Sequence, residues 1–100
     1  MAEKQLVSVV LPVYNQADTI QCCLETLVRQ TYFPKEIIVV NDGSKDETPA
    51  QLQEFSKKNP IQILHIAHAG RSAARNLGAR HAQGSILAFA EADAEYDPSY

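Results

Sequence analysis

The sequence lacks a long apolar run. None of its apolar stretches approaches the about 20 residues that a helix needs to cross a bilayer. It also lacks the pattern of a signal peptide, because Glu3 and Lys4 precede a strand-like run and no small-residue cleavage site follows. We therefore expect a cytoplasmic protein, with any anchor to the cytoplasmic face of a membrane lying in further chain.

Cysteine and positive charge are also scarce. The two cysteines, Cys22 and Cys23, are adjacent, and neighbouring cysteines rarely pair with each other. No Cys-x-x-Cys spacing for a metal is present, so we expect two reduced helix residues, in keeping with a reducing compartment. The formal net charge of −3 argues against nucleic acid as a partner.

Three common motifs of nucleotide and acyl chemistry are missing. No Gly-x-Gly-x-x-Gly follows the first apolar run, which argues against a dinucleotide-binding oxidoreductase. The phosphate loop Gly-x-x-x-x-Gly-Lys-Ser/Thr and the nucleophile elbow Gly-x-Ser-x-Gly are absent as well. With 100 residues, 45% of them hydrophobic and 21% charged, the chain has the composition of one globular domain or part of one.

Four continuous apolar runs are present, over residues 6–11, 36–40, 61–66 and 85–89. Continuous rather than alternating apolar runs are typical of strands buried on both faces. Helical patterns separate these runs, and the third helix is predicted over about 72–82. The order strand, helix, strand therefore predicts an α/β fold with a parallel sheet and right-handed crossovers.

Local signals predict where the helices begin and end. Asp18 is a candidate N-cap of the first helix, and Thr48 caps the second, with Pro49 at the first helical position and Gln51 three residues after the cap. Gly84 suits the C-terminal end of the third helix. The first helix carries one apolar stripe, formed by Ile20, Cys23, Leu24, Leu27 and Val28.

Polar residues follow each predicted strand, and open α/β sheets bind ligands at this carboxyl edge. Tyr14 offers an aromatic face to a base, although Val13 and Tyr14 could equally belong to the edge of the core. Asp42 either hydrogen-bonds a base or ribose or satisfies local backbone donors of its turn. Arg71 and Arg75 flank a helix start, where a phosphate is favoured. The histidines after the third strand, His65 and His68, are expected to be structural or surface residues.

An acidic cluster follows the fourth strand. Its members Glu91, Asp93, Glu95 and Asp97 alternate along the chain, which places them on one side of an extended segment. Oxygen-only ligands of this kind suit a hard divalent cation such as Mg²⁺ or Mn²⁺. The alternative is a solvated acidic loop.

Four segments of the sequence resemble a known protein family. Residues 9–15 (VVLPVYN), 36–46 (EIIVVNDGSKD), 74–78 (ARNLG) and 91–93 (EAD) are similar to family 2 glycosyltransferases of the GT-A fold. The resemblance implies an open, mostly parallel Rossmann-like sheet with strand order 3-2-1-4 and helices on both faces. It also implies that residues 1–100 form the N-terminal nucleotide-sugar-binding half of a GT-A domain, without the acceptor-binding half.

The resemblance further implies a nucleotide-sugar donor, most often a UDP-sugar, and a divalent cation, Mg²⁺ or Mn²⁺. Asp93 is expected to bind the metal, with Glu91 as a second ligand. Glu91 and Ala94 depart from the usual Asp-x-Asp pattern, and the longer side chain of Glu91 places its carboxylate at a slightly different point from that of Asp. The implied donor-binding residues are Pro12, Val13, Tyr14 and Asn15 around the base and ribose, Asp42 against the base, Arg71 and Arg75, and Glu91, Ala92 and Asp93.

Two functions follow from these expectations. In the first, the chain is the donor-binding part of an inverting glycosyltransferase whose acceptor hydroxyl belongs to a sugar, a lipid or a polysaccharide. No catalytic base is expected within the chain, so by itself it should transfer little or no sugar. In the second, it is a non-catalytic nucleotide-binding or assembly module. Apolar surface near the fourth strand is expected to promote self-association.

Overall fold

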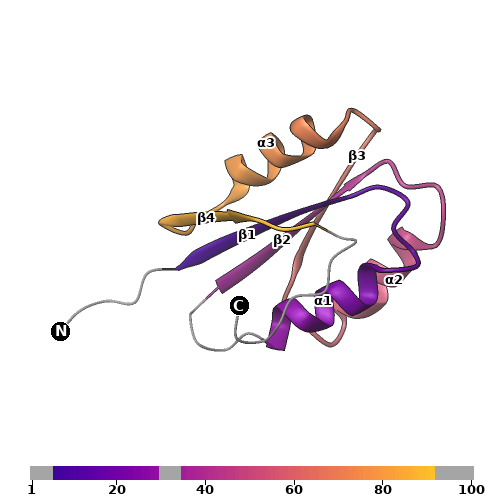
Figure 1. Ribbon diagram of the computed structural model, residues 1–100, viewed down its shortest axis with the longest axis horizontal. Helices are drawn as coiled ribbons and strands as arrows, with labels where there is room; N and C mark the ends of the chain where they lie inside the picture. Colours follow the sequence, from indigo (N-terminus) through magenta and orange to yellow (C-terminus); the bar gives the residue numbers. More distant parts are fainter. Residues whose placement is uncertain (1–5, 30–34, 92–100) are drawn as a thin grey trace.

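The chain forms one four-stranded sheet with helices on both of its faces. The computed structural model describes residues 6–29 and 35–91. The strands are all parallel and lie in the order β3-β2-β1-β4, which confirms the fold class predicted from the sequence (Figure 1). The elements in chain order are β1 (Val7–Val13), α1 (Ile20–Arg29), β2 (Lys35–Asp42), α2 (Thr48–Ser56), β3 (Gln62–Ile66), α3 (Arg71–His81) and β4 (Ile86–Phe89).

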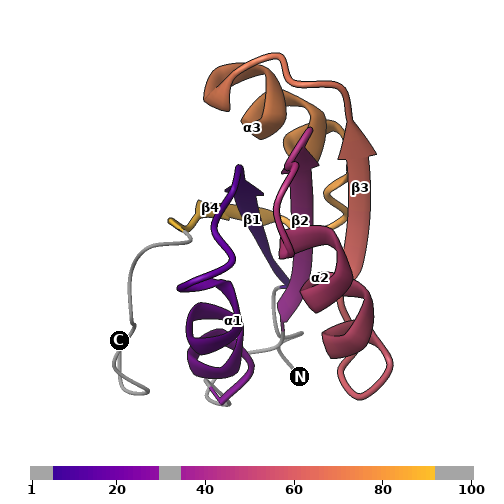
Figure 2. The ribbon, with the colours of Figure 1, turned by 90° about the vertical axis from the view of Figure 1, so that its right-hand side faces the viewer.

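The two faces of the sheet bury separate apolar cores. Helices α1 and α2 cover one face and α3 covers the other (Figure 2). Side chains alternate between faces along a strand, so Val9 and Leu11 of β1 join the core under α1, whereas Val10 joins the core under α3. This two-sided burial explains why the strand sequences are continuously apolar.

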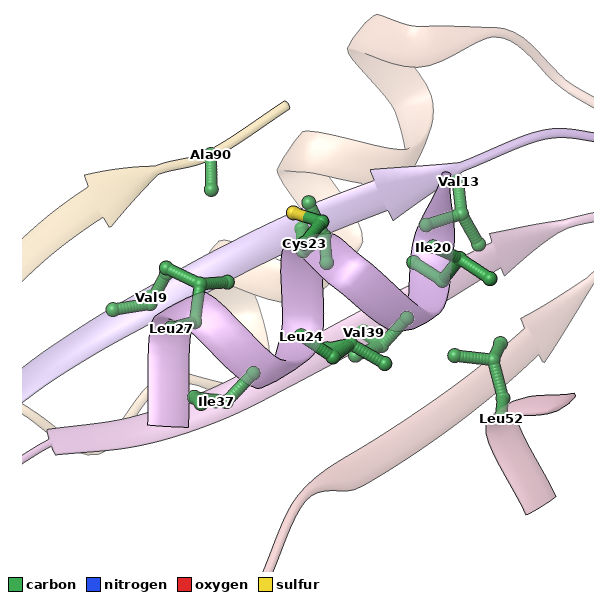
Figure 3. Close-up of a cluster of buried hydrophobic side chains, with 11 residues drawn as sticks. Val9, Val13, Ile20, Cys23, Leu24, Leu27, Ile37, Val39, Leu52 and Ala90 are labelled. Carbon is green, nitrogen blue, oxygen red and sulfur yellow. The ribbon is translucent and has the colours of Figure 1, made fainter. Parts of the chain in front are cut away.

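The apolar stripe predicted for the first helix is confirmed. Figure 3 shows the buried side chains of α1 directed at β1 and β2, and Val28 packs against the same core at its margin. Cys23 is buried in this core and Cys22 is exposed. In the sequence, Pro34 predicts that this helix ends near Thr31, a position that lies outside the described residues. No helix of residues 6–29 and 35–91 has the length and apolar character of a bilayer span.

The predicted helix caps are wrong in detail. The carbonyl of Thr19 accepts the Cys23 N–H, so Thr19 rather than Asp18 stands at the start of α1. Helix α2 already includes Thr48, and its N-cap residue, Glu47, makes no side-chain cap bond. The carboxylate of Asp46 accepts the Thr48 N–H at 2.9 Å. The Thr48 hydroxyl instead accepts the backbone N–H of Gln16, a partner far away in the sequence that a local cap rule does not consider.

Gly84 does not end α3, contrary to the sequence prediction. The helix ends at His81, and Ala82 at its C-cap position has an extended backbone. A Cβ at Gly84 would collide with the Leu6 carbonyl oxygen and lie 2.7 Å from the Ser8 hydroxyl oxygen. Glycine is needed here because the backbone passes directly against β1.

Candidate functional site

The loops after β1 and β2 are joined by hydrogen bonds between backbone and side chains. The Asn15 N–H donates to Ser44 Oγ at 2.9 Å, and Asn15 Oδ1 accepts the Lys45 N–H at 2.8 Å. Asn15 has a positive φ of 51°, which asparagine tolerates better than most residues. Two further bonds join the same loops, from the Gln16 N–H to Thr48 Oγ1 and from the Ala17 N–H to Asp46 Oδ2.

Asp42 joins the end of β2 to the loop after β3. The residue is almost fully buried, at 3% exposure, and its carboxylate accepts the N–H groups of Ala69 at 2.8 Å and Gly70 at 3.0 Å. Nδ1 of His68 lies 3.0 Å from Asp42 Oδ2. The loops also touch beside this cluster, where a Cβ on Gly43 would lie 2.6 Å from the His68 backbone nitrogen. Asp42 therefore fixes the loop between β3 and α3.

Tyr14 and His68 form an aromatic pair at this edge of the sheet. Their ring centroids lie 4.2 Å apart and their planes are tilted by 30°. Tyr14 comes from the end of β1 and His68 from the loop after β3, so the pair bridges over the end of β2. Both side chains are partly exposed, which leaves aromatic surface available to a ligand.

A crevice of about 190 Å³ opens at the carboxyl ends of the strands. A larger hollow of about 400 Å³ lies between α1 and α2, but its lining includes no residue from a strand end. Because ligands of open α/β sheets bind outside the carboxyl ends of the strands, the smaller crevice is the candidate site. It is lined by Pro12, Val13, Tyr14, Gln16, Asp42, His68 and Arg71.

The two predicted arginines lie in different surroundings. Arg71 opens α3 and lines the crevice, next to Gly70, which supplies no side-chain cap. The first N–H groups of α3 and the Arg71 guanidinium are both suited to an anion. Arg75 lies one turn further on, with its guanidinium carbon 5.7 Å from the ring centroid of Phe89. Its buried Nε has no hydrogen-bond partner within residues 6–29 and 35–91, and it does not line the crevice.

The acidic cluster is only partly within the described residues. Glu91 is exposed directly after the buried Ala90, whereas Ala92, Asp93, Glu95 and Asp97 lie outside the described residues. In the described part of the chain, no group of three or more histidine, cysteine, aspartate or glutamate side chains could hold a metal ion. One exposed carboxylate is by itself too few oxygen ligands for Mg²⁺ or Mn²⁺, and the main predicted ligand, Asp93, lies outside the described residues.

The crevice brings together five of the residues predicted to bind a donor, namely Pro12, Val13, Tyr14, Asp42 and Arg71. Asn15 lies beside it, held by the neighbouring loop. Two lining residues, Gln16 and His68, were not expected there. His68 lies just after the end of β3, as Tyr14 and Asp42 lie at the ends of β1 and β2. The same rule, polar residues at the carboxyl ends of strands, could therefore have identified it.

Several known proteins resemble this chain in sequence and in fold. The uncharacterised glycosyltransferase YibD of Escherichia coli K12 is 41% identical over 93 residues, which cover 92% of this chain and 27% of YibD. Staphylococcus aureus TarS, residues 1–349, superimposes with a TM-score of 0.83 at 26% identity, covering 93% of this chain and 29% of that TarS fragment. TarS has also been solved with UDP-GlcNAc.

A third similar protein is the mannosyltransferase PcManGT of Pyrobaculum calidifontis, solved with GDP-Man and Mn²⁺. It has a TM-score of 0.82 at 29% identity, covering 94% of this chain and 29% of PcManGT. The chain thus spans less than a third of the length of each of these proteins, and the shared architecture is the expected GT-A-type sheet. The family model described as Glycosyl transferase family 2 matches residues 8–100, nearly the whole sequence, so the chain belongs to glycosyl transferase family 2.

Proposed function

We propose that residues 1–100 are the donor-binding part of a glycosyltransferase that moves a sugar from a nucleotide sugar to an acceptor hydroxyl. A UDP-sugar is the first candidate donor, because TarS binds UDP-GlcNAc, and the GDP-Man complex of PcManGT makes a GDP-sugar the second. The main support for the proposal is the crevice that Tyr14, Asp42 and Arg71 line together.

Each part of the crevice suits one part of a nucleotide. The ring surface at Tyr14 suits stacking of a base, since every nucleobase has a π-face. Arg71 and the uncapped start of α3 suit the diphosphate. At about 190 Å³ the crevice is smaller than the roughly 300 Å³ or more of a pocket for a whole ligand, so it would hold the base, with the diphosphate and sugar lying outward.

In the proposed reaction, the acceptor hydroxyl attacks the anomeric carbon opposite the leaving nucleoside diphosphate, which inverts the configuration. The base that removes the hydroxyl proton is expected outside these residues. Glu91 and Asp93 are the proposed ligands of a divalent cation, which when bound would neutralise charge on the diphosphate. The chain alone should therefore bind a donor without transferring its sugar.

The proposal is tested by calorimetric titration of the chain with UDP, GDP and TDP, with and without Mn²⁺. Replacing Tyr14 by Ala should weaken binding of the preferred nucleotide about tenfold, because base–aromatic stacking is lost. Tyr14→Phe keeps the ring and should bind within about twofold of the unmodified chain.

The same titration also tests whether Asp93 binds a divalent cation. Asp93→Ala should abolish any gain in affinity that Mn²⁺ confers, while leaving the metal-free affinity unchanged. If none of the three nucleotides binds, the proposed function is wrong. If the gain from Mn²⁺ survives in Asp93→Ala, the metal assignment is wrong.

A further inference from the structure

The groove between α1 and α2 is more polar than a contact between two helices requires. Both helices cover the same face of the sheet and lie next to each other (Figure 2). The walls of this α1–α2 groove include Glu25 and Arg29 on one side and Gln51, Glu54, Phe55 and Lys58 on the other. Seven of its nine described lining residues are polar or charged, whereas the side of a helix that packs on a neighbour is usually apolar. Packing between the helices therefore does not account for this composition.

The charges on the described walls of the groove cancel. Glu25 and Glu54 are acidic, Arg29 and Lys58 are basic, and the four charges sum to zero. Acid and base lie four residues apart on each wall, about one helical turn. Such a surface has no net attraction for polyanions or polycations. It offers acceptors and donors side by side, which suits a neutral ligand with several hydroxyl groups, because each hydroxyl both donates and accepts.

One buried acceptor at the groove receives no hydrogen bond from the described chain. Gln51 Oε1 is buried, and none of the described residues donates to it. Most buried polar groups in proteins are hydrogen-bonded, because an unpaired acceptor loses its bond to water without a replacement. A ligand hydroxyl that donates to Gln51 Oε1 would remove this cost, so the orphaned acceptor favours a ligand in the groove.

The groove also has an apolar surface. Phe55 and Val28 line it and pack at the same time against the core under α1 and α2. A sugar ring presents C–H groups on one face, which can pack on an aromatic ring while the hydroxyls at its edge form hydrogen bonds. The volume of about 400 Å³ lies within the range of roughly 300–1,000 Å³ for small-molecule sites. The aromatic ring, the polar walls and the volume together fit a short saccharide.

We propose that the α1–α2 groove is a saccharide-binding site, separate from the nucleotide crevice. Phe55 packs against the apolar face of a sugar ring, Gln51 Oε1 accepts one hydroxyl, and the charged side chains bind the others. The choice of a saccharide rests on the proposed function, because a glycosyltransferase acts on acceptors and products that carry sugars. The groove contains no residue from a strand end, so it holds such a chain away from the reacting atoms.

Two pairs of substitutions test the site. Gln51→Ala removes the acceptor and should weaken saccharide binding about fivefold, as expected for the loss of one hydrogen bond. Gln53→Ala changes the same residue type on the same helix outside the groove and should bind normally. Phe55→Leu keeps an apolar side chain on the core but loses the flat ring, and should weaken binding about threefold. Phe55→Tyr keeps the ring and should bind within about twofold of the unmodified chain.

Heteronuclear NMR titration measures both the affinity and the position of a bound saccharide. The probes are chitotriose, mannotriose and cellotriose, and thermal unfolding of each variant verifies that it is folded. At least one probe should shift the amide signals of Glu25, Gln51 and Phe55, and saturating UDP should not displace it. The inference is wrong if no probe shifts these signals, if UDP displaces the saccharide, or if Gln51→Ala and Phe55→Leu both bind normally.

Nucleotide binding by the same chain separates this inference from the proposed function. Normal nucleotide binding without saccharide binding rejects the groove site alone. Saccharide binding in the groove without nucleotide binding supports the groove site and rejects the proposed function. Absence of both rejects both.

Discussion

Ser8 and Glu36 form a hydrogen-bond cluster at the amino ends of β1 and β2, at the end of the sheet opposite the crevice. Ser8 is buried and Glu36 is partly exposed. Glu36 Oε2 accepts the Ser8 hydroxyl at 2.5 Å and the Gln83 N–H at 2.6 Å, and Ser8 Oγ accepts the Gly84 N–H at 2.8 Å. These bonds hold the connection between α3 and β4 against β1 and β2. The hydrogen bond from Ser8, followed by that from Gln83, lowers the pKa of Glu36 below its ordinary value.

Because the pKa of Glu36 is lower in the folded state, this residue contributes less to stability in acid. The folded pKa lies below the unfolded value of about 4.3, so Glu36 stabilises the fold above that pH, and this contribution is lost as the pH falls through the folded pKa. Glu36→Gln should cost about 1 kcal/mol at pH 7 and progressively less in acid, allowing for solvent screening. Urea unfolding of both proteins at neutral and acidic pH measures this difference. The exposed Glu54→Gln is the control, and an equal cost for Glu36→Gln at all pH values would contradict the prediction.

At the scale of elements, α3 lies unusually close to the sheet. Gly78 is buried, and a Cβ placed on it would overlap the side chain of Val10 on β1. Val10 is itself fully buried and β-branched, so its side chain has little freedom to move aside. The helix therefore needs glycine at this position, even though glycine is a poor helix former.

Gly78→Ala should destabilise the protein by about 1–2 kcal/mol, because overpacking against Val10 outweighs the gain in helix propensity of about 1 kcal/mol. Asn76→Ala, on the exposed side of the same helix, introduces the same residue without the overlap and should leave stability unchanged or slightly raised. Chemical denaturation of the two variants measures both effects. A stabilised Gly78→Ala would show that α3 can move away from the sheet at little cost.

At the scale of the whole molecule, β4 is the edge strand of the described sheet that exposes large apolar side chains. Its large apolar side chains Ile86, Leu87 and Phe89 are 44%, 44% and 49% exposed. Within the described residues β4 pairs only with β1, so its other edge also presents backbone hydrogen-bonding groups. Apolar exposure beside an unpaired strand edge favours association between copies of the chain.

We expect the chain to self-associate with rising concentration through this edge. Leu87→Lys should shift it toward the monomer, because a charge on an exposed edge strand opposes edge-to-edge pairing. Sedimentation velocity over a series of concentrations measures the change. Gln53→Lys, an exposed site on α2, adds the same charge away from β4 and should not alter the association. A chain that is monomeric at every concentration would refute this expectation.

The fold, and the edge of the sheet at which the polar residues gather, could be predicted from the sequence because they depend on repeating features. Continuous apolar runs predicted strands covered on both faces, and the helical stripe from Ile20 to Leu27 predicted the buried side of α1. The parallel order then placed Tyr14 and Asp42 at one edge. The predicted cap at Thr48 was wrong because its hydroxyl accepts the N–H of Gln16 instead of an N–H of its own helix. A rule based on neighbouring residues does not consider a partner that is distant in the sequence.

The sequence by itself determined the order of the elements, the parallel sheet and the edge that carries the polar residues, because apolar periodicity and chain connectivity are encoded along the chain. Only the tertiary structure decided which atoms meet at that edge: Asp42 with the backbone of Ala69 and Gly70, and Tyr14 with His68. These contacts join residues that are 27, 28 and 54 positions apart in the sequence. Hydrogen bonds and ring contacts depend on separations of a few ångströms between loops, which no spacing in the sequence specifies.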